Sequence, residues 1–487
     1  MARIFGIAAA APDGCSVLEL GCGSGGHLFS MARQLPQTRF VGLDLSEVEI
    51  GRARSRCKVL GLQNVELIHA SITDIDPELG EFDYVIAHGI YSWVPDEVRQ
   101  AVLVTCRRHL ARDGVAYVSY NTFPGWYLRG MVRDMMLYHV EEVDDPMAQI
   151  AGSRELLTLL GQALPEENLY GALLRNEMDH LVGQPDDYVY HDQLSPDNKA
   201  FWFRDFVAAA EEHQLQYLAE TVFSTMVGPN VPPAVMARLP SGSRIRTAQY
   251  LDFINHRAFR HTLLVHEHHE LESHLDWRIW QDKWVAAYLK APDGADLSDG
   301  VAIPFEDRDG RKMSTSNTLM NAVFLELCHH PQGLEFVELV VRAKARMGEP
   351  LEDGDIAEAG AGLLAALAYD RVEPLLAPYR FVLQAGELPL ASHHARLAAQ
   401  LKDACMPTLR HDQVTLDEFD RRLLMLMDGT RTRSQLVEEL IGIVKRKELE
   451  IEVDGEHIAD AEQLRSLFTA ALKMKLWAYG RDALLEA

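Results

Sequence analysis

The chain has 487 residues, about three times the length of a typical single domain, so we expect two to four domains. Hydrophobic residues make up 47% and charged residues 24% of the sequence, which is typical of globular proteins and excludes disordered and fibrous classes. Asp and Glu outnumber Lys and Arg by 72 to 47, and the resulting net charge of −25 disfavours nucleic-acid backbones and anionic lipid surfaces as partners.

The six cysteines are scattered along the sequence without a C-x-x-C pair. In a long chain this pattern predicts reduced thiols, and neither a disulfide framework nor a zinc site. No apolar run approaches the roughly 18 residues that a membrane helix needs, and residues 1–14 lack the pattern of a signal peptide. We therefore expect a cytoplasmic protein without a membrane partner.

The first 120 residues alternate predicted strands with predicted helices. Ser46, followed by Glu49 three residues later, is typical of a helix start. The strands are expected at 16–20, 39–44, 65–69, 82–87 and 114–120, and the helices at 26–34, after Ser46 and at 95–110. Strands separated by one helix each indicate β-α-β units and a parallel sheet that is covered on both faces.

A glycine-rich turn joins the first strand to the first helix. Glycines there let the backbone approach a ligand closely, because they carry no side chain. Gly21, Gly23 and Gly26 also match the G-x-G-x-x-G pattern of dinucleotide-binding proteins. Asp44, at the end of the second strand, is placed to bind a pair of ribose hydroxyls. These two signals alone leave a nicotinamide cofactor and S-adenosylmethionine open.

Three further features favour S-adenosylmethionine. Glu19 stands two residues before the first glycine, where an acid suits a cationic amino-acid group and would repel a pyrophosphate. The second strand continues into Leu45 and Ser46, and the fourth strand leads into His88 and Gly89. The ordered set resembles class I S-adenosylmethionine-dependent methyltransferases, which implies a Rossmann-like seven-stranded α/β sheet and this cofactor.

The resemblance also implies which residues bind the cofactor. Glu19, Gly21, Gly23 and Gly25 correspond to the methionine end, although Gly25 and Gly26 can also serve helix packing alone. The remaining positions are Asp44 for the ribose, Leu45, Ser71 and Ile72 for the adenine, Asp74 for its amino group, and His88 beside the sulfonium.

A second resemblance extends over most of the remaining chain. It rests on Tyr91 and Trp93 after the fourth strand, Asn121 and Trp126 after the fifth, and the stretch 249–266. Together these resemble bacterial methyltransferases with a methyltransferase regulatory domain, whose characterised members include protein lysine methyltransferases acting on bacterial outer-membrane proteins. One departure is His191-Asp192, where the family usually has His-Glu; the charge is retained.

A class I sheet needs two more strands, which we expect at 215–220 and 260–265, after a helix at 203–213. Residues 1–128 and 198–268 would then form the cofactor-binding domain. Residues 129–197 look helical, with strand-like character only at 188–190, and would form an insertion that caps the substrate site or mediates dimerisation to a homodimer.

The chain changes character after residue 268. Strands are expected at 284–291 and 301–305, and helices at 319–328, 334–345, 356–368, 416–427, 433–444 and 461–476. Two units of three helices with small sheets suggest α+β winged-helix-like domains, a middle regulatory domain at 269–385 and a C-terminal domain at 386–487. Because the chain is acidic and lacks a basic recognition helix, we expect these domains to contact protein, not nucleic acid.

The cofactor's chemistry predicts the catalytic side chains. The methyl group moves in one in-line displacement, so the protein needs to align the acceptor and keep an amine deprotonated. His88 is the nearest candidate base. Tyr91, Trp93 and Asn121 are expected around the methyl group with Tyr120 and Trp126, where aromatic faces would stabilise an ammonium ion. Packing in the interior is the alternative for each of them.

Two local features need separate mention. In the run from His266 to His274, Glu270 has helical spacing to both histidines, as in some metal sites, but such a run at a strand end is typical of solvated surface, so we expect no metal. Only about fifteen residues precede the first strand, where class I enzymes normally have a helix, so we expect a truncated or misassigned start.

Three classes of function remain open from the sequence. The first is a lysine methyltransferase with a protein acceptor. The second is a methyltransferase with a small-molecule acceptor, as in secondary metabolism. The third is a non-catalytic partner protein in which the later domains carry the function.

Overall fold

The computed structural model describes residues 1–165, 168–240, 242–402, 405–453, 456–458 and 460–486. The chain divides into two units, Met1–Ile279 with Leu364–Asp370, and Trp280–Leu363 with Arg371–Ala487. Within the described ranges, no helix is both long enough and apolar enough to cross a membrane.

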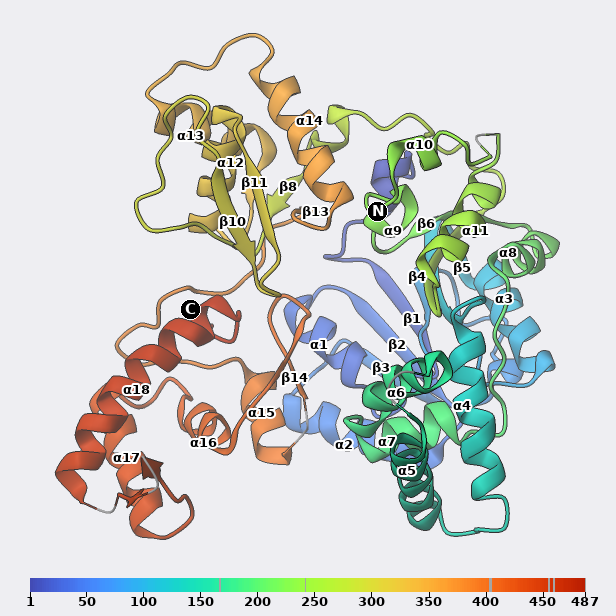
Figure 1. Ribbon diagram of the computed structural model, residues 1–487, viewed down its shortest axis with the longest axis horizontal. Coiled ribbons are helices and arrows are strands. Elements are labelled where there is room, and N and C mark those ends of the chain that lie inside the picture. The colour runs from blue at the N-terminus through green and yellow to red at the C-terminus, as the bar shows by residue number, and fades with distance from the viewer. Residues whose placement is uncertain (166–167, 241, 403–404, 454–455, 459, 487) are drawn as a thin grey trace. The chain divides into compact units, whose positions relative to one another are not determined.

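A seven-stranded sheet lies at the centre of the first unit (Figure 1). Its strands are β1 (Ser16–Leu20), β2 (Arg39–Asp44), β3 (Val65–His69), β4 (Phe82–Ala87), β5 (Leu110–Asn121), β6 (Leu215–Glu220) and β7 (Phe259–His266). Their order is β3-β2-β1-β4-β5-β7-β6, and β7 runs antiparallel to both of its neighbours. The predicted Rossmann-like class I sheet is confirmed, and strands β1 to β4 and β6 have the predicted bounds.

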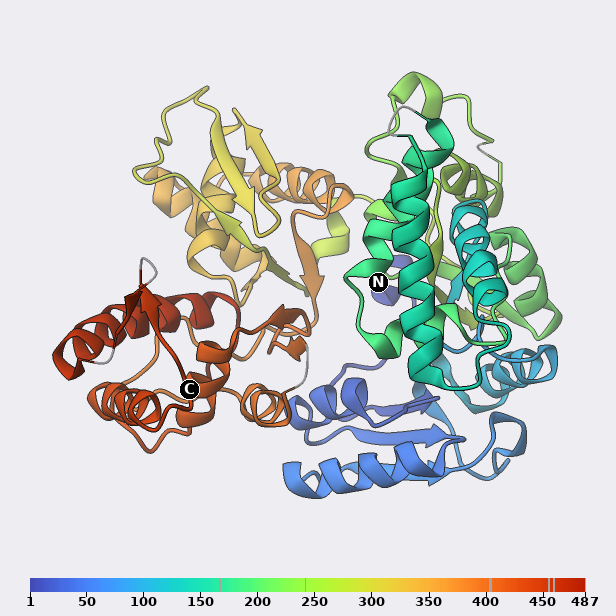
Figure 2. The ribbon, with the colours of Figure 1, turned by 60° about the horizontal axis from the view of Figure 1, so that its bottom comes forward.

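Helices cover both faces of this sheet, as Figure 2 shows. They are α1 (Gly26–Gln34), α2 (Glu47–Leu60), α3 (Asp96–His109), α8 (Phe203–Glu212), α11 (Arg244–Asn255), and the short α9 (Ser224–Val227) and α10 (Pro233–Met236). Ser46 caps α2 by accepting a hydrogen bond from the backbone of Glu49, as predicted. One core cluster joins apolar residues of β1, β4 and β5 to α3 and α8, so two helices distant in sequence bury the same face.

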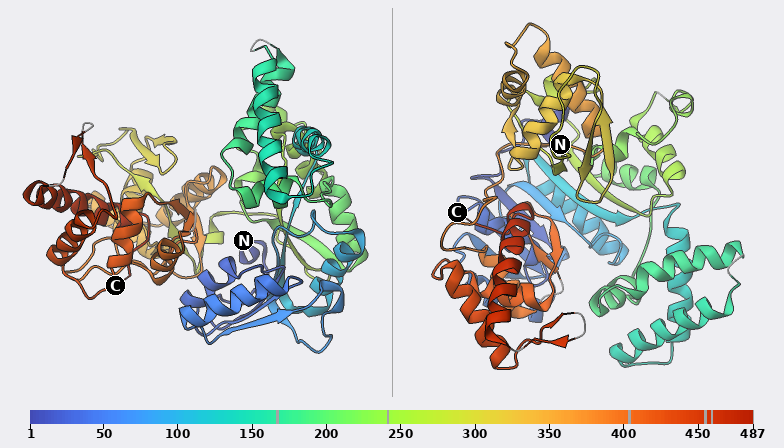
Figure 3. Two further views of the ribbon diagram at one scale, coloured as in Figure 1. Left: turned by 90° about the horizontal axis from the view of Figure 1, so that it is seen from below. Right: turned by 60° about the vertical axis from the view of Figure 1, so that its left-hand side comes forward.

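Between β5 and α8 the chain forms a helical insertion that projects from the sheet (Figure 3). It contains α4 (Trp126–His139), α5 (Pro146–Ala163), α6 (Leu169–Val182), α7 (Asp186–Tyr188) and a π-helical turn at Val189–Gln193, with residues 166–167 outside the described chain. The strand-like character at 188–190 was misleading, because Val189 is buried in the insertion's own helical core. Tertiary packing overrides the strand propensity of these residues.

The second unit begins with an α+β region. Its strands are β8 (Trp284–Ala286), β9 (Leu289–Lys290), β10 (Ile303–Asp307), β11 (Lys312–Thr315), β12 (Leu334–Glu335) and β13 (Glu373–Leu375). Its helices are α12 (Thr318–His329), α13 (Phe336–Met347) and the first part of α14 (Asp355–Ala368), whose residues from Leu364 onward belong to the first unit. The predicted single strand at 284–291 is wrong: it is split between β8 and β9, which pair in two different sheets.

The C-terminal region has the predicted three helices and one more. Its elements are α15 (His393–Leu401), β14 (Cys405–Pro407), β15 (Gln413–Thr415), α16 (Glu418–Leu426), α17 (Arg433–Lys445), β16 (Glu452–Val453), β17 (Glu456–His457) and α18 (Ala461–Arg481). Apolar residues of all four helices form one core. Helices with two small antiparallel pairs of strands give this region the α+β, winged-helix-like character that the sequence predicts.

Candidate active site

The glycine turn after β1 depends on left-handed backbone conformations. Gly21, Gly23 and Gly25 have φ of 67°, 51° and 81°. A Cβ at Gly21 would lie 2.1 Å from Cδ1 of Ile90, and one at Gly25 would lie 2.4 Å from the ring of Phe29. A Cβ at Gly23 would instead have no protein atom within 4 Å. The backbone angle favours glycine at Gly21 and Gly25, and the side chains of Ile90 and Phe29 lie close to both, whereas Gly23 borders open space that a ligand can use.

Glu19 lies beside this turn, and one of its two carboxylate oxygens lacks a hydrogen-bond partner among the described residues. Its side chain is buried, with 4% of the residue exposed, and Oε1 lies 3.1 Å from Nδ1 of His27 on α1. The hydrogen bond to Glu19 raises the pKa of His27 above its usual value. Oε2 is buried and has no hydrogen-bond partner in the described part of the chain. Because an unpaired buried acceptor costs about 1–3 kcal/mol, the position suits a cationic donor from a ligand.

Asp44 is held rigidly at the end of β2. Its Oδ2 accepts a hydrogen bond from the backbone of Gly23 at 2.8 Å, and its Oδ1 accepts one from Ser46 at 2.8 Å. Each carboxylate oxygen keeps a second lone pair with which it can accept a ribose hydroxyl. The neighbouring Cys22 is no nucleophile, because burial, followed by the charges of Glu19 and Asp44, raises its pKa to about 12.

The residues predicted for the adenine lie after β2 and β3, which are adjacent in the sheet. Leu45 is 72% exposed, and its carbonyl oxygen is 3.0 Å from Nε2 of His69. Ser71 caps a short 3-10 helix, Ile72–Asp74, and Ile72 packs against the edge of the core. Since parallel strands end at the same edge of a sheet, these residues lie on the same side as the glycine turn.

His88 follows β4 directly. Its Nδ1 lies 2.8 Å from the hydroxyl of Tyr117 and 3.2 Å from that of Ser119. Burial by the surrounding protein, and then the neighbouring His261 and His27, lower the pKa of His88 to about 4. The ring is therefore neutral at physiological pH. It is a weaker base than the sequence suggested, and it adds no positive charge next to a sulfonium or an amine.

A row of five aromatic rings starts at His88, and we call it the aromatic row: His88, Tyr117, His261, Phe259 and Trp93. Ring centroids are 5.7 Å apart for His88 and Tyr117, 6.0 Å for Tyr117 and His261, 5.0 Å for His261 and Phe259, and 6.2 Å for Phe259 and Trp93. Nε1 of Trp93 is buried and lacks a hydrogen-bond partner among the described residues. The row thus offers aromatic faces and one free donor beside the end of β4.

Sequence reasoning missed three members of this row, Tyr117, Phe259 and His261. Alternation along a strand places Tyr117, Ser119 and Asn121 on one face of β5. The pairing of Ser119 with His261, and of Asn121 with Phe259, then adds the β7 residues to the same face. Only the alternation was visible in the sequence.

Other predicted side chains lie elsewhere. Tyr91 is 2% exposed and packs against Tyr120, Phe201 and Phe206, so its ring belongs to the core and does not reach the aromatic row. Tyr120 and Trp126 are also buried. For these three, interior packing, the alternative weighed from the sequence, fits the structure.

Asn121 has a connecting role. Its Nδ2 donates to Oδ1 of Asn198 at 3.0 Å, and Nδ2 of Asn198 donates to the carbonyl of Asp192 at 2.7 Å. The side chain therefore joins the end of β5 to the segment that follows the insertion.

The stretch 249–266 contains a buried ion network. Arg260 is 1% exposed and contacts Glu220 on β6 at 2.5 Å and Asp252 on α11 at 2.8 Å. Arg257 lies within 4 Å of both carboxylates. The charged residues that carried the second resemblance thus fasten β6, α11 and β7 together.

Comparisons with known proteins agree with this geometry. Three family models match: a methyltransferase domain at 17–114, a predicted methyltransferase regulatory domain at 185–266, and the PKMT C-terminal winged helix domain at 387–484. The uncharacterised protein RP789 of Rickettsia prowazekii is 33% identical over 489 residues, which cover 97% of this chain and 88% of the relative.

Among solved structures, PKMT2 from Rickettsia typhi matches with a TM-score of 0.89 and 24% identity over 100% of this chain and 97% of the other. The same protein in complex with AdoHcy matches with a TM-score of 0.89 and 25% identity, over 99% and 96% of the two chains.

The fold and the site define a class I S-adenosylmethionine-dependent methyltransferase, and the cofactor is S-adenosylmethionine. The unpaired Oε2 of Glu19 and the open space at Gly23 fit its ammonium group and its backbone-lined pocket. The chain belongs to the family of methyltransferases that combine this domain with the methyltransferase regulatory domain and the PKMT C-terminal winged helix.

Proposed function

We propose that the protein is a lysine N-methyltransferase that acts on a protein or peptide acceptor. The observation that carries the proposal is the likeness to PKMT2 along essentially the whole chain, including the PKMT winged helix. The aromatic row supports it, because aromatic faces hold methylated ammonium groups and exclude water.

We propose that the cofactor's ammonium group binds Glu19 and that its ribose hydroxyls bind Asp44. Gly21, Gly23 and Gly25 would line the methionine end, and Leu45, Ser71 and Ile72, with Asp74 at the amino group, would surround the adenine. His88 would lie beside the sulfonium. The paired geometry of Glu19 and Asp44 at adjacent strand ends supports this assignment.

The bound cofactor supplies a methyl group on a positively charged sulfur. The lysine nitrogen forms a bond to this carbon as the carbon–sulfur bond breaks, and the nitrogen then loses one proton. Desolvation beside Trp93 and Phe259 would lower the pKa of the lysine, so that more of it is the neutral amine. Because His88 is a weak base, we assign the proton to water and give the imidazole a positioning role.

We also propose the following division of the chain. Residues 1–128 and 198–268 bind the cofactor, 129–197 form a cap or dimerisation element, and 386–487 form the C-terminal domain. Residues 269–385 form a middle domain with a regulatory role, distinct from the stretch 185–266 that matches the regulatory domain model. The projecting helices of the insertion and the match of the winged helix model support these limits. The location is the cytoplasm, and neither nucleic acid nor membrane is a partner, as the acidic charge suggests.

Lysine acceptors can be tested directly. The full chain is incubated with S-adenosylmethionine and a bacterial outer-membrane protein preparation, and tryptic peptides are analysed by tandem mass spectrometry. We expect 14-Da steps located on lysine side chains, and none when S-adenosylmethionine is left out. Methylation of added free amines or carboxylic acids, without modified lysine peptides, would favour a small-molecule acceptor. Cofactor binding without any transfer would contradict the proposal.

A further inference from the structure

A cluster of two histidines and one carboxylate lies at the opposite edge of the sheet from the glycine turn. Asp113 stands near the start of β5, and His268 and His269 follow the end of β7. Because β7 is antiparallel to β5, its end meets the start of β5. The cluster is therefore remote from the carboxyl ends of the parallel strands, and the methyl-transfer site does not use it.

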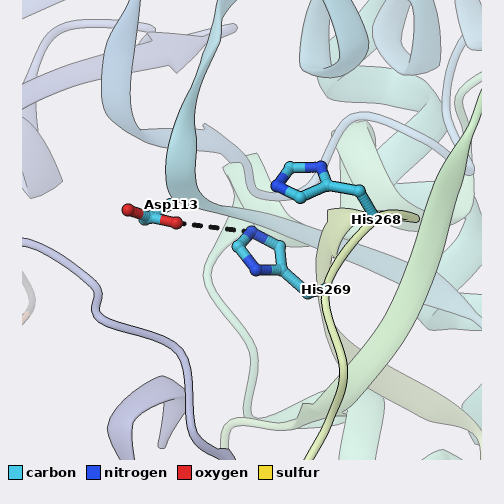
Figure 4. A group of neighbouring side chains, drawn as sticks. All are labelled: Asp113, His268 and His269. Carbon is cyan, nitrogen blue, oxygen red and sulfur yellow. Dashed lines mark ion pairs between the residues drawn. The ribbon is translucent and has the colours of Figure 1, made fainter.

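The three side chains face one another (Figure 4). One ligand atom from each lies within 4.8 Å of the other two. Nε2 of His269 is 3.7 Å from Oδ1 of Asp113, and the rings of His268 and His269 have centroids 4.1 Å apart. Small rotations of the exposed Asp113 and His268 would bring these atoms to the spacing of ligands about 2.1 Å from one ion.

Hydrogen bonds hold the backbone and one ring of the cluster in place without a bound ion. Nε2 of Gln216 donates to the carbonyl oxygens of both His266 and His269, at 3.0 and 2.8 Å. Nε2 of His269 donates to the carbonyl of Arg112 at 2.9 Å. A cation bound at this nitrogen would replace that proton, which would move to Nδ1, and the Arg112 carbonyl would remain nearby as a further oxygen.

The cluster also lacks a strong internal partner for its charges. Asp113 is half-exposed, and its carboxylate approaches His269 only to 3.7 Å.

We propose that Asp113, His268 and His269 form a binding site for a divalent transition-metal ion, with Zn²⁺ as the reference ion. Two imidazole nitrogens and one carboxylate suit Zn²⁺, Ni²⁺ or Co²⁺ and do not suit Mg²⁺ or Ca²⁺, which prefer oxygen ligands. Bound there, the ion joins the start of β5 to the end of β7 and stabilises that edge of the sheet. From the sequence, the histidine run was weighed as a metal site with Glu270 and set aside; Asp113 lies far from this run in the chain, and only the strand pairing brings it close.

The site is tested on the full chain without an affinity tag, by titration with Zn²⁺ against a competing chromophoric chelator. We expect one high-affinity ion per chain in the wild type and at least a tenfold loss of affinity in the double variant Asp113→Asn, His268→Asn. The matched control is His274→Asn, which removes an exposed histidine of the same run and should bind like the wild type.

Two further measurements separate metal binding from misfolding and from non-specific binding. Zn²⁺ should raise the thermal midpoint of the wild type and of the control variant but not of the double variant. S-adenosylmethionine affinity should be equal in all three proteins. The proposal is overturned if the double variant binds Zn²⁺ as tightly as the wild type, or if the wild type binds none.

Discussion

Glu19→Gln gives the sharpest test of the cofactor site. The substitution keeps the shape of the side chain and removes the negative charge. A hydrogen bond between charged groups contributes about 1.5–3 kcal/mol, and in a site that is 4% exposed it is little weakened by water. At about 1.4 kcal/mol per tenfold, S-adenosylmethionine should bind roughly 10- to 150-fold more weakly.

Without ligand, Glu19→Gln should leave the stability of the protein unchanged or raise it slightly. Because Oε2 of Glu19 is buried without a partner, removal of the charge relieves a desolvation cost while it weakens the contact with His27. We expect the free energy of unfolding without ligand to change by less than about 1 kcal/mol. Affinity is measured by titration calorimetry and stability by thermal unfolding with and without cofactor.

Glu66→Gln is the matched control. Glu66 lies on β3, which β2 separates from the strand of Glu19. It is exposed and pairs with Arg39 at 3.2 Å, so its loss should alter neither affinity nor stability. If Glu19→Gln bound S-adenosylmethionine as tightly as the wild type, with its fold intact, the assignment of Glu19 to the ammonium group would be wrong.

The remaining predictions concern the turn, its histidine and the ion network. Gly23→Ala should weaken S-adenosylmethionine binding at least tenfold, because the new methyl group fills the open space. The control Gly61→Ala, at φ 65° and also facing open space, should cost about 1 kcal/mol of stability and no affinity. Equal affinities in both variants would contradict this role of Gly23. Protonated His27 competes with the cofactor's ammonium group for Glu19. Since the pKa of His27 is raised, affinity should increase as the pH rises through that value, by no more than about tenfold per unit, and His27→Asn should flatten the profile measured by calorimetry. Arg260→Met leaves two buried carboxylates without their main partner and should cost about 3–5 kcal/mol, a fall of at least about 6 °C in the thermal midpoint. Arg204→Met, which removes an exposed pair, should shift the midpoint by less than about 2 °C, and a similar small shift for Arg260→Met would refute the role of the network.

Much of the cofactor half of the site could be predicted from the sequence because it is local. The turn from Glu19 to Gly25 requires particular backbone angles and an acid at a fixed spacing, and neighbouring residues in the sequence specify both. Asp44 ends one strand and His88 follows another, and the apolar runs of both strands are short and clearly bounded. The sequence raised helix packing as an alternative for Gly25, but it did not reveal that Gly21 lies against the side chain of Ile90.

The acceptor side depended on tertiary structure. The sequence placed Tyr91 and Asn121 near the methyl group, but whether a side chain faces the core or the cleft is decided by packing of α8 and by the segment after the insertion. His261 entered the aromatic row only through its pairing with Ser119. Similarly, Asp113 met His268 and His269 only because β7 returns antiparallel to β5.

The sequence by itself therefore determined the strands, the glycine turn and the acid that precedes it, since hydrophobic period and backbone angle are properties of near neighbours. Only the tertiary structure decided the aromatic row, the ion network of Arg260 and the histidine cluster. Strand order and register depend on the total burial of apolar side chains over the whole sheet, and no short stretch of sequence determines that total.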